Sequence, residues 1–188
     1  AGIHDEFVKK MITATKALIV GNALEKTTQI GPVVDFRQFE QNKKYIKSAQ
    51  KEGARMVTGD ETINVNKDGF YMRPTLFTET NNQMEINRKE VFGPIACVIK
   101  VNNYEEALMI SNDSDFGLTS GIVTQSLKQA SHFKRHSESG CVMVNLPTAG
   151  TDYHVPFGGR KASSYGPREQ GTYAKEFYTI VKTTYISA

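Results

Sequence analysis

The sequence lacks the features that mark several special classes of protein. No uncharged apolar run approaches the roughly 18 residues of a membrane-spanning helix, so we expect no contact with a membrane. No concentrated basic segment accompanies the net charge of +3, built from 23 basic and 20 acidic residues, so nucleic acid is not an expected partner. The two cysteines cannot form a disulfide framework, and we expect no secretory leader. These absences favour a cytoplasmic protein.

What is present is typical of a globular α/β fold. Apolar residues make up 39% and charged residues 23% of the 188 residues, which suffice for one substantial domain. Helical spacing and capping residues predict helices at residues 5–20, 36–51, 103–110 and 126–136. Apolar runs predict strands at residues 55–57, 70–77, 95–101, 118–124 and 141–144. Strands that alternate with helices in this way indicate an α/β fold with a largely parallel sheet flanked by helices.

Two segments interrupt this alternation. Residues 145–171 hold five of the 15 glycines and three of the six prolines, and loops of this length are usually functional or interfacial. Residues 176–187 are rich in β-branched residues, so we expect a terminal strand that bridges to a neighbouring subunit. The expected division is a catalytic portion at 1–175 and an oligomerisation strand at 176–188. The chain also begins with Ala1-Gly2 and enters a predicted helix at once, which favours an excised piece.

The thiols and histidines offer no evident reactive centre. Cys97 and Cys141 each lie within an apolar run, with no cation, histidine or glycine turn beside them to lower a thiol pKa. We interpret both as small apolar residues of buried strands. His132 and His136 have the i, i+4 spacing of a metal-chelating pair, but no acidic or thiol ligand accompanies them. We interpret them as part of a solvated basic helix face and expect no metal.

Glu90 and Phe92 stand two positions apart, just before a Gly-Pro turn and a predicted buried strand. In an extended segment both side chains would lean to the same side. A carboxylate can accept two hydrogen bonds from a vicinal diol such as that of a ribose, and a ring can supply a flat apolar wall. The same spacing also fits a surface glutamate beside a core phenylalanine. Similarly, the loop at 147–161 mixes aromatic residues with glycines, and fits either a substrate-binding lip or a subunit contact.

Several motifs, in this order and separation, resemble the C-terminal part of the aldehyde dehydrogenase family. The match runs along nearly the whole chain, and its most specific parts are Glu-x-Phe-Gly-Pro and Pro-Phe-Gly-Gly-x-Lys. The sequences that resemble the family are Gly31-Pro32-Val33, 89–94, 112–118, Val144-Asn145, 156–161 and Arg168-Glu169. Within the family, residues 148–155 and 163–169 look like the α-ketoglutarate semialdehyde (2,5-dioxovalerate) dehydrogenases.

The resemblance implies three contacts with a nicotinamide cofactor, NAD or NADP. Glu90 matches the carboxylate that holds the nicotinamide ribose, and Phe92 matches the ring beside the nicotinamide. Gln38 falls near a position that touches the ribose in relatives.

The resemblance also implies contacts with a small aldehyde substrate. Phe157 matches an aromatic residue of the aldehyde tunnel, and Gly150 and Thr151 fall near the substrate anchor loop. Glu169 matches a proton-relay glutamate, and this chain has one or two extra residues between Lys161 and Arg168 relative to the family.

In this family a cysteine thiolate attacks the aldehyde, a hydride passes to the cofactor, and a glutamate activates the water that hydrolyses the thioester. No residue here matches that cysteine, that base or the nucleotide-binding half of the family's fold. We therefore expect a fragment of an aldehyde dehydrogenase that is inactive alone and forms a homodimer or larger homo-oligomer through 176–187. The alternatives are a non-catalytic assembly module and, further behind, a related reductase of acyl phosphates or acyl-CoA.

Overall fold

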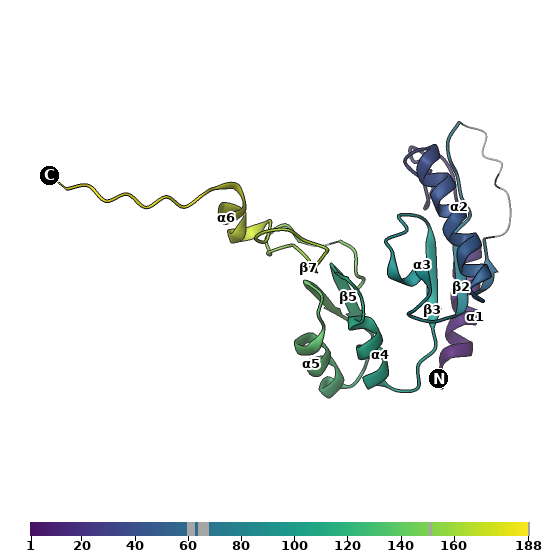
Figure 1. Ribbon diagram of the computed structural model, residues 1–188. Coiled ribbons are helices and arrows are strands. Elements are labelled where there is room, and N and C mark those ends of the chain that lie inside the picture. The colour runs from purple at the N-terminus through teal and green to yellow at the C-terminus, as the bar shows by residue number, and fades with distance from the viewer. Residues whose placement is uncertain (60–62, 64–67, 151, 188) are drawn as a thin grey trace. The chain divides into compact units, whose positions relative to one another are not determined.

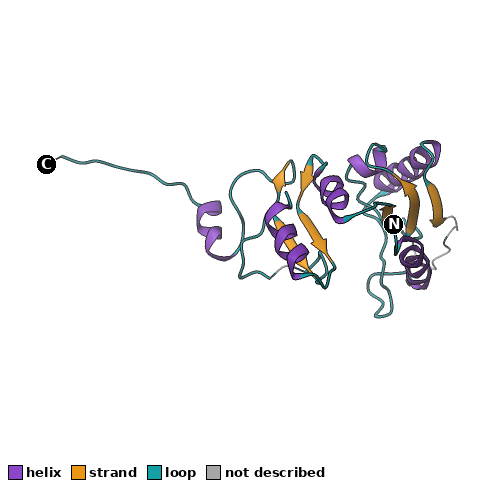
Figure 2. Ribbon diagram, turned by 90° about the horizontal axis from the view of Figure 1, so that it is seen from below, coloured by secondary structure: helices purple, strands orange, loops and turns teal. Residues whose placement is uncertain are grey.

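The computed structural model describes residues 1–59, 63, 68–150 and 152–187. The chain divides into two compact units, Ala1–Asn103 and Tyr104–Ala188, each with its own strands and helices (Figures 1 and 2). None of the helices in these described residues is long and apolar enough to cross a membrane.

The first unit is built on a three-stranded mixed sheet. Its strands, in the spatial order β1-β2-β3, are β1 (Arg55–Thr58), β2 (Thr75–Thr80) and β3 (Ile95–Ile99). β1 runs antiparallel to β2, and β3 runs parallel to it, so Phe77 of β2 has Met56 and Cys97 as its neighbours. The helices of this unit are α1 (His4–Ala17), α2 (Phe36–Lys51) and α3 (Glu85–Arg88).

The core of the first unit lies between α2, α3 and the central strand. Phe77 of β2 and Ala49 of α2 are both fully buried, and Met84 and Ile86 from the α3 region complete the cluster. Helix α2 begins where the sequence predicts, because the Asp35 carboxylate accepts a 2.7 Å hydrogen bond from the backbone N–H of Gln38.

The second unit carries two small sheets. β5 (Thr119–Ile122) runs parallel to β6 (Cys141–Val144), and β4 (Phe116–Gly117) runs antiparallel to β7 (Arg160–Lys161). Its helices are α4 (Tyr104–Asn112), α5 (Leu127–His136), the 3-10 turn η1 (Gly171–Tyr173) and α6 (Ala174–Tyr178). Ser126 caps α5 by accepting from the backbone N–H of Gln129 at 3.2 Å.

The expected α/β class is confirmed, but the sheets of the described residues are mixed rather than largely parallel, since β1–β2 and β4–β7 pair antiparallel. Two segments also differ from the prediction. The strand predicted at 70–77 is β2 at Thr75–Thr80, because Pro74 has no N–H for a ladder and Thr75 makes the first bond, to the carbonyl of Pro94 at 2.8 Å. The prediction of a strand from Glu176 is wrong at its start, since residues 176–178 complete the short helix α6. Residues 179–187 form neither helix nor strand, and their pairing with another chain stays a prediction.

Candidate functional site

In the first unit, Glu90 and Phe92 lie in a turn between α3 and β3, and both are exposed. The Phe92 side chain is 73% exposed, so this residue does not belong to the core. Its backbone has φ 52°, the left-handed region that residues with a side chain rarely occupy. The turn therefore displays a carboxylate and a ring to solvent rather than burying the ring.

Gln38 lies beside this turn although it is 53 positions away in sequence. Its Nε2 donates to the carbonyl of Val91 at 2.8 Å and to Oδ1 of Asn42 at 2.7 Å. Both hydrogens of the Gln38 amide are thus used within the protein, so a bound ligand could hydrogen-bond to this side chain only through its Oε1. The structure brings together the three residues that the resemblance assigns to cofactor binding.

In the second unit, a cavity of about 390 Å³ lies between β6 and the loop that follows it. Phe157 and Gly150, both predicted substrate contacts, line this cavity, while Thr151 lies outside the described residues. The lining is mostly apolar and comprises Gly140, Cys141, Val142, Met143, Leu146, Pro147, Ala149, Gly150, Asp152, Val155, Pro156 and Phe157. A pocket of this size and composition suits a small organic substrate.

Asp152 is the one charged residue among those lining residues. Its Oδ1 accepts from the backbone N–H of His154 at 2.9 Å and lies 2.8 Å from Nδ1 of the same histidine. These hydrogen bonds, the backbone one first, lower the pKa of the Asp152 carboxyl. Asp152 therefore brings a carboxylate to the edge of a mostly apolar cavity.

Glu169 is held next to Phe157 through the backbone. The two residues exchange N–H···O bonds of 2.7 and 2.8 Å. The Glu169 side chain is exposed and is not among the residues that line the cavity, so its role as a proton relay stays a prediction. Arg168 packs into a slot formed by Gly140 and Gly158, where any Cβ would meet its guanidinium group.

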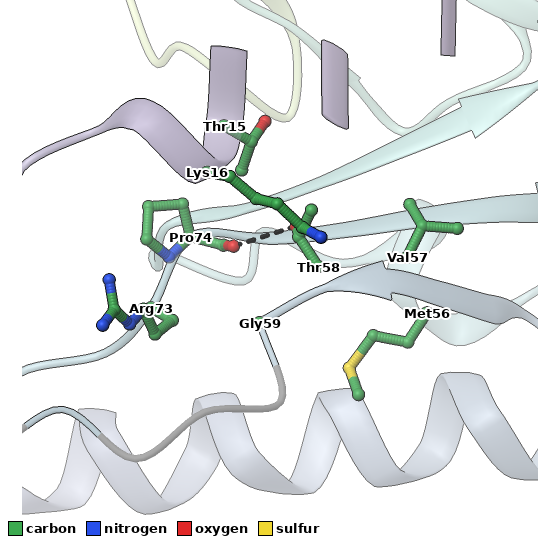
Figure 3. Close-up of a pocket in the computed structure, with 8 residues that line it drawn as sticks. All are labelled: Thr15, Lys16, Met56, Val57, Thr58, Gly59, Arg73 and Pro74. Atoms are coloured by element: carbon green, nitrogen blue, oxygen red, sulfur yellow. Dashed lines mark hydrogen bonds between the residues drawn. The ribbon is translucent and has the colours of Figure 1, made fainter. Parts of the chain in front are cut away.

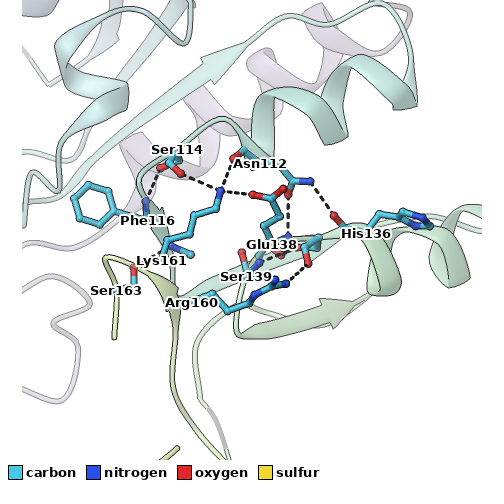
Figure 4. Close-up of polar contacts among 12 residues, drawn as sticks. Asn112, Ser114, Phe116, His136, Glu138, Ser139, Arg160, Lys161 and Ser163 are labelled. Carbon is cyan, nitrogen blue, oxygen red and sulfur yellow. Dashed lines mark hydrogen bonds and ion pairs between the residues drawn. The ribbon is translucent and has the colours of Figure 1, made fainter. Parts of the chain in front are cut away.

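Lys161 fastens the cavity loop to the body of the second unit, a function that the sequence analysis missed. Its Nζ donates to the carbonyls of Asn112 at 2.5 Å and Ser114 at 3.0 Å, and pairs with the Glu138 carboxylate at 2.5 Å (Figure 4). The hydrogen bond and charge of Lys161 lower the pKa of Glu138. The only signal for this role is the lysine of Pro-Phe-Gly-Gly-x-Lys, whose partners lie far away in sequence.

The two cysteines lie in strands, as predicted. In β3, Cys97 is half-buried, and burial raises the pKa of its thiol to about 11. Cys141 of β6 lines the cavity, and its Sγ lies 3.8 Å from the carbonyl oxygen of Gly158. The sequence does not reveal that Cys141 lines a cavity, because this depends on where the following loop packs.

The paired histidines are engaged within the protein. The rings of His132 and His136 stack at 3.9 Å, Nδ1 of His132 lies 2.8 Å from the Tyr104 hydroxyl, and Nδ1 of His136 donates to the carbonyl of His132. Among the described residues, no group of three or more His, Cys, Asp and Glu side chains is placed to hold a metal ion.

A further cavity, of about 440 Å³, lies in the first unit at the end of α1 (Figure 3). Lys16 and Arg73 contribute cationic side chains to it, and the hydroxyl of Thr58 donates to the carbonyl of Pro74 at 3.1 Å beside it. None of the predicted site residues lines this cavity.

Comparison with known proteins identifies the class to which this chain belongs. The model of the aldehyde dehydrogenase family matches residues 1–184, and the chain belongs to that family. Among solved structures, an aldehyde dehydrogenase from Bacillus cereus has a TM-score of 0.89 and 32% identity over 96% of this chain and 36% of its own. A betaine aldehyde dehydrogenase from Staphylococcus aureus, in complex with NAD⁺, has a TM-score of 0.88 and 30% identity over 94% of this chain and 35% of its own.

Curated relatives give finer resemblances. The chain is 36% identical to an alpha-ketoglutaric semialdehyde dehydrogenase of Bacillus subtilis over 99% of its length and 38% of the relative's. It is 38% identical to an alpha-ketoglutarate semialdehyde dehydrogenase of Haloferax volcanii, over 98% of this chain and 39% of that one. A betaine aldehyde dehydrogenase of Rhizobium johnstonii is 35% identical over 98% of this chain and 38% of its own. The chain thus spans less than two fifths of the length of these relatives.

Proposed function

We propose that these residues supply cofactor and substrate contacts of an NAD(P)-dependent aldehyde dehydrogenase, with α-ketoglutarate semialdehyde as the first candidate substrate. The observation that carries the proposal is the turn at Glu90 and Phe92, which displays a carboxylate and a ring to solvent. Exposed aromatic rings held in an unfavourable backbone conformation are more often part of a binding site than of a core. The semialdehyde dehydrogenases among the relatives support the substrate class.

In the proposed cofactor site, the Glu90 carboxylate would accept hydrogen bonds from the ribose hydroxyls, and the Phe92 ring would supply an apolar wall for the nicotinamide. Gln38 adds a ribose contact through its Oε1. NAD⁺ in the Staphylococcus aureus structure supports this choice of cofactor. A nicotinamide cofactor held there would supply the hydride acceptor for oxidation of the aldehyde.

In the proposed substrate site, Phe157 and Gly150 shape the cavity that receives the aldehyde. Thr151, which the resemblance also assigns to the substrate, lies outside the described residues. Glu169 relays a proton. The cavity offers the substrate a mostly apolar wall. The two backbone hydrogen bonds between Phe157 and Glu169 hold the glutamate's backbone beside that wall.

Neither thiol of this chain suits the nucleophilic step. Attack on an aldehyde needs a thiolate, and burial raises the pKa of Cys97 to about 11, so this residue is a neutral thiol near pH 7. Cys141 lies in a strand with its Sγ 3.8 Å from the carbonyl oxygen of Gly158, and its sequence surroundings do not match the family's nucleophilic cysteine. We therefore propose that another part of a longer enzyme supplies the thiolate, and that the 188 residues alone do not oxidise aldehydes.

Two measurements on the purified chain test this function. Absorbance at 340 nm should show no NADH formed from NAD⁺ and an aldehyde, and turnover above trace level would contradict the proposed absence of a nucleophile. In NMR titrations, NAD⁺ should shift the signals of Phe92. Glu90→Gln should weaken this binding about ten- to hundredfold, since a lost charge-assisted hydrogen bond costs about 1.5–3 kcal/mol. Glu25→Gln, at another exposed glutamate of the same unit, is the control and should leave binding unchanged.

A second candidate function is assembly. Ile180, Val181, Tyr185 and Ile186 are almost fully exposed in the single chain, as expected of a segment that pairs with a neighbouring subunit. The division into a catalytic portion at 1–175 and an oligomerisation strand at 176–188, and a cytoplasmic location, are part of this proposal.

A further inference from the structure

The backbone of Phe92 needs support from its surroundings. A left-handed conformation is unfavourable for a residue with a Cβ, and it persists only where neighbouring contacts impose it. The Phe92 ring, being largely exposed, supplies little packing of its own. The support must therefore come through the residues on either side, Val91 and Gly93.

On the upstream side, the support is a pair of side-chain amides on α2. Gln38 and Asn42 are four residues apart, so they lie on one face of the helix. Gln38 Nε2 bridges Asn42 Oδ1 at 2.7 Å and the carbonyl of Val91 at 2.8 Å. This bridge fixes the peptide group that immediately precedes Phe92.

On the downstream side, Gly93 packs directly on Asn42. A Cβ on Gly93 would overlap the Asn42 amide, so the backbone reaches this position only because residue 93 is glycine. The next residues are fixed as well, since Ile95 N–H donates to the Gly93 carbonyl and Thr75 N–H donates to the Pro94 carbonyl, each at 2.8 Å.

Asn42 is an unusual residue for its position. It is fully buried, and its Nδ2 lies 3.5 Å from Sδ of Met72. A buried amide is costly unless its polar atoms have partners, and here the partners are Gln38 and Met72. An apolar residue would fill this space without the desolvation of an amide, so the amide is explained by the turn that it supports.

We propose that Gln38 and Asn42 form an amide pair that positions Glu90 and Phe92 for a nicotinamide nucleotide. Asn42 is a positioning residue that never touches the ligand and acts through Gln38 and Gly93. Gln38 serves the cofactor first by holding the Val91 carbonyl, with both hydrogens of its amide committed to that task. The nature of the ligand rests on the proposed function, whereas the conformation of the turn does not.

The first test follows the turn without any ligand. In the 188-residue chain, the ¹³Cα shift and the HN–Hα coupling of Phe92 report its φ, and hydrogen exchange of residues 89–94 reports local opening. Gln38→Met and Asn42→Leu should move both Phe92 parameters away from left-handed values and speed exchange at least tenfold. Gln38→Met leaves Asn42 in the core and so provides a folded variant even if Asn42→Leu does not fold.

Two further variants separate positioning from stability. Asn42→Asp retains an oxygen acceptor for Gln38, so the Phe92 signals should stay near those of the wild type even where urea unfolding shows lower stability. Gln41→Leu changes an exposed neighbour on the same helix and should change neither exchange nor the Phe92 signals. If Gln38→Met leaves the φ of Phe92 and the exchange of 89–94 unchanged, the amide pair does not position the turn.

The second test adds NAD⁺ to the same samples. Gln38→Met should weaken NAD⁺ binding about tenfold, and Asn42→Asp should weaken it much less. If NAD⁺ does not shift the NMR signals of Phe92 in the wild-type chain, the proposed function fails. The first test still shows whether Gln38 and Asn42 hold the turn. If the turn opens in Gln38→Met but NAD⁺ binds it as tightly as the wild type, the pair is structural only and the positioning role is overturned.

Discussion

Burial governs the chemistry of Cys97, whose side chain packs in β3 against the core around Phe77. Because its pKa is raised to about 11, the thiol stays protonated until the pH is well above 9. We expect iodoacetamide to modify Cys97 much more slowly in the folded chain than in urea at pH 8, as measured by peptide mass spectrometry. Equal rates in the two states would contradict the burial of this thiol.

The same shift makes the stability of the first unit depend on alkaline pH. The unfolded thiol ionises near pH 8.5, so the contribution of Cys97 is complete below that pH and is lost as the pH rises through about 11. Urea unfolding of the chain at pH 8 and pH 10.5 measures the loss. Cys97→Ala should reduce this dependence on pH.

Some contacts of single residues could not be predicted from the sequence. The spacing of Glu90 and Phe92 left the ring as either a ligand wall or a core residue, and its exposure decides against the core. The sequence offered no way to see that Gln38 hydrogen-bonds to Val91, since 53 positions separate them and no periodicity links them. Asn42 was missed for the same reason, because an asparagine within a helix reads as a surface residue until its neighbours are known.

Among the elements, β7 depends most on one side chain. Lys161 has an unfavourable φ of 53° and compensates by binding the carbonyls of Asn112 and Ser114 at the end of α4. Lys161→Met should lower the stability of the second unit by about 1 kcal/mol, since it removes a charged donor from exposed carbonyls that water can reach, and the Asn112 carbonyl still accepts from the Ser114 N–H. Urea unfolding followed by circular dichroism measures the change, with hydrogen exchange of residues 157–163 as the local probe.

Lys128→Met, at an exposed position of α5, is the control for this change. The stabilities of the two variants should also depend differently on pH in the acid range. The contribution of the Glu138–Lys161 pair is present above the ordinary glutamate pKa and is lost as the pH falls through the lowered pKa of Glu138. Only Lys161→Met should remove this dependence, and equal stabilities of the two variants would exclude an anchoring role for Lys161.

The elements were predictable where local chemistry sets them. Asp35 and Ser126 cap α2 and α5 as the sequence predicts, because a cap needs only a side chain and the N–H three positions later. The strand predicted at 70–77 and the start of the strand predicted from Glu176 were wrong, because tertiary contacts set the bounds of β2 and α6. Thr75 takes its partner from Pro94, and the β-branched composition that predicted a strand begins only at Thr179, after α6 has ended.

At the scale of the whole chain, the sequence predicted the α/β class and the family but no division at Asn103. Between Ile95 and Phe116 there is no glycine or proline, so composition gives no sign of a boundary there. Compact units are defined by which residues contact one another across long separations, and single-sequence patterns do not contain that information. The division predicted at 175 stays a prediction about assembly.

That prediction is tested by removing the tail. Four apolar side chains, Ile180, Val181, Tyr185 and Ile186, are 89–96% exposed, and burying each is worth about 1.5–3 kcal/mol. We expect the chain to self-associate at micromolar concentration and a variant ending at Thr179 to sediment as a smaller species. Lys182→Ser, which leaves the apolar residues in place, should sediment like the wild type. A wild-type chain that sediments as a monomer under these conditions would show that the tail does not join subunits. The exposed apolar side chains of the tail would then stay in contact with water instead of being buried between subunits.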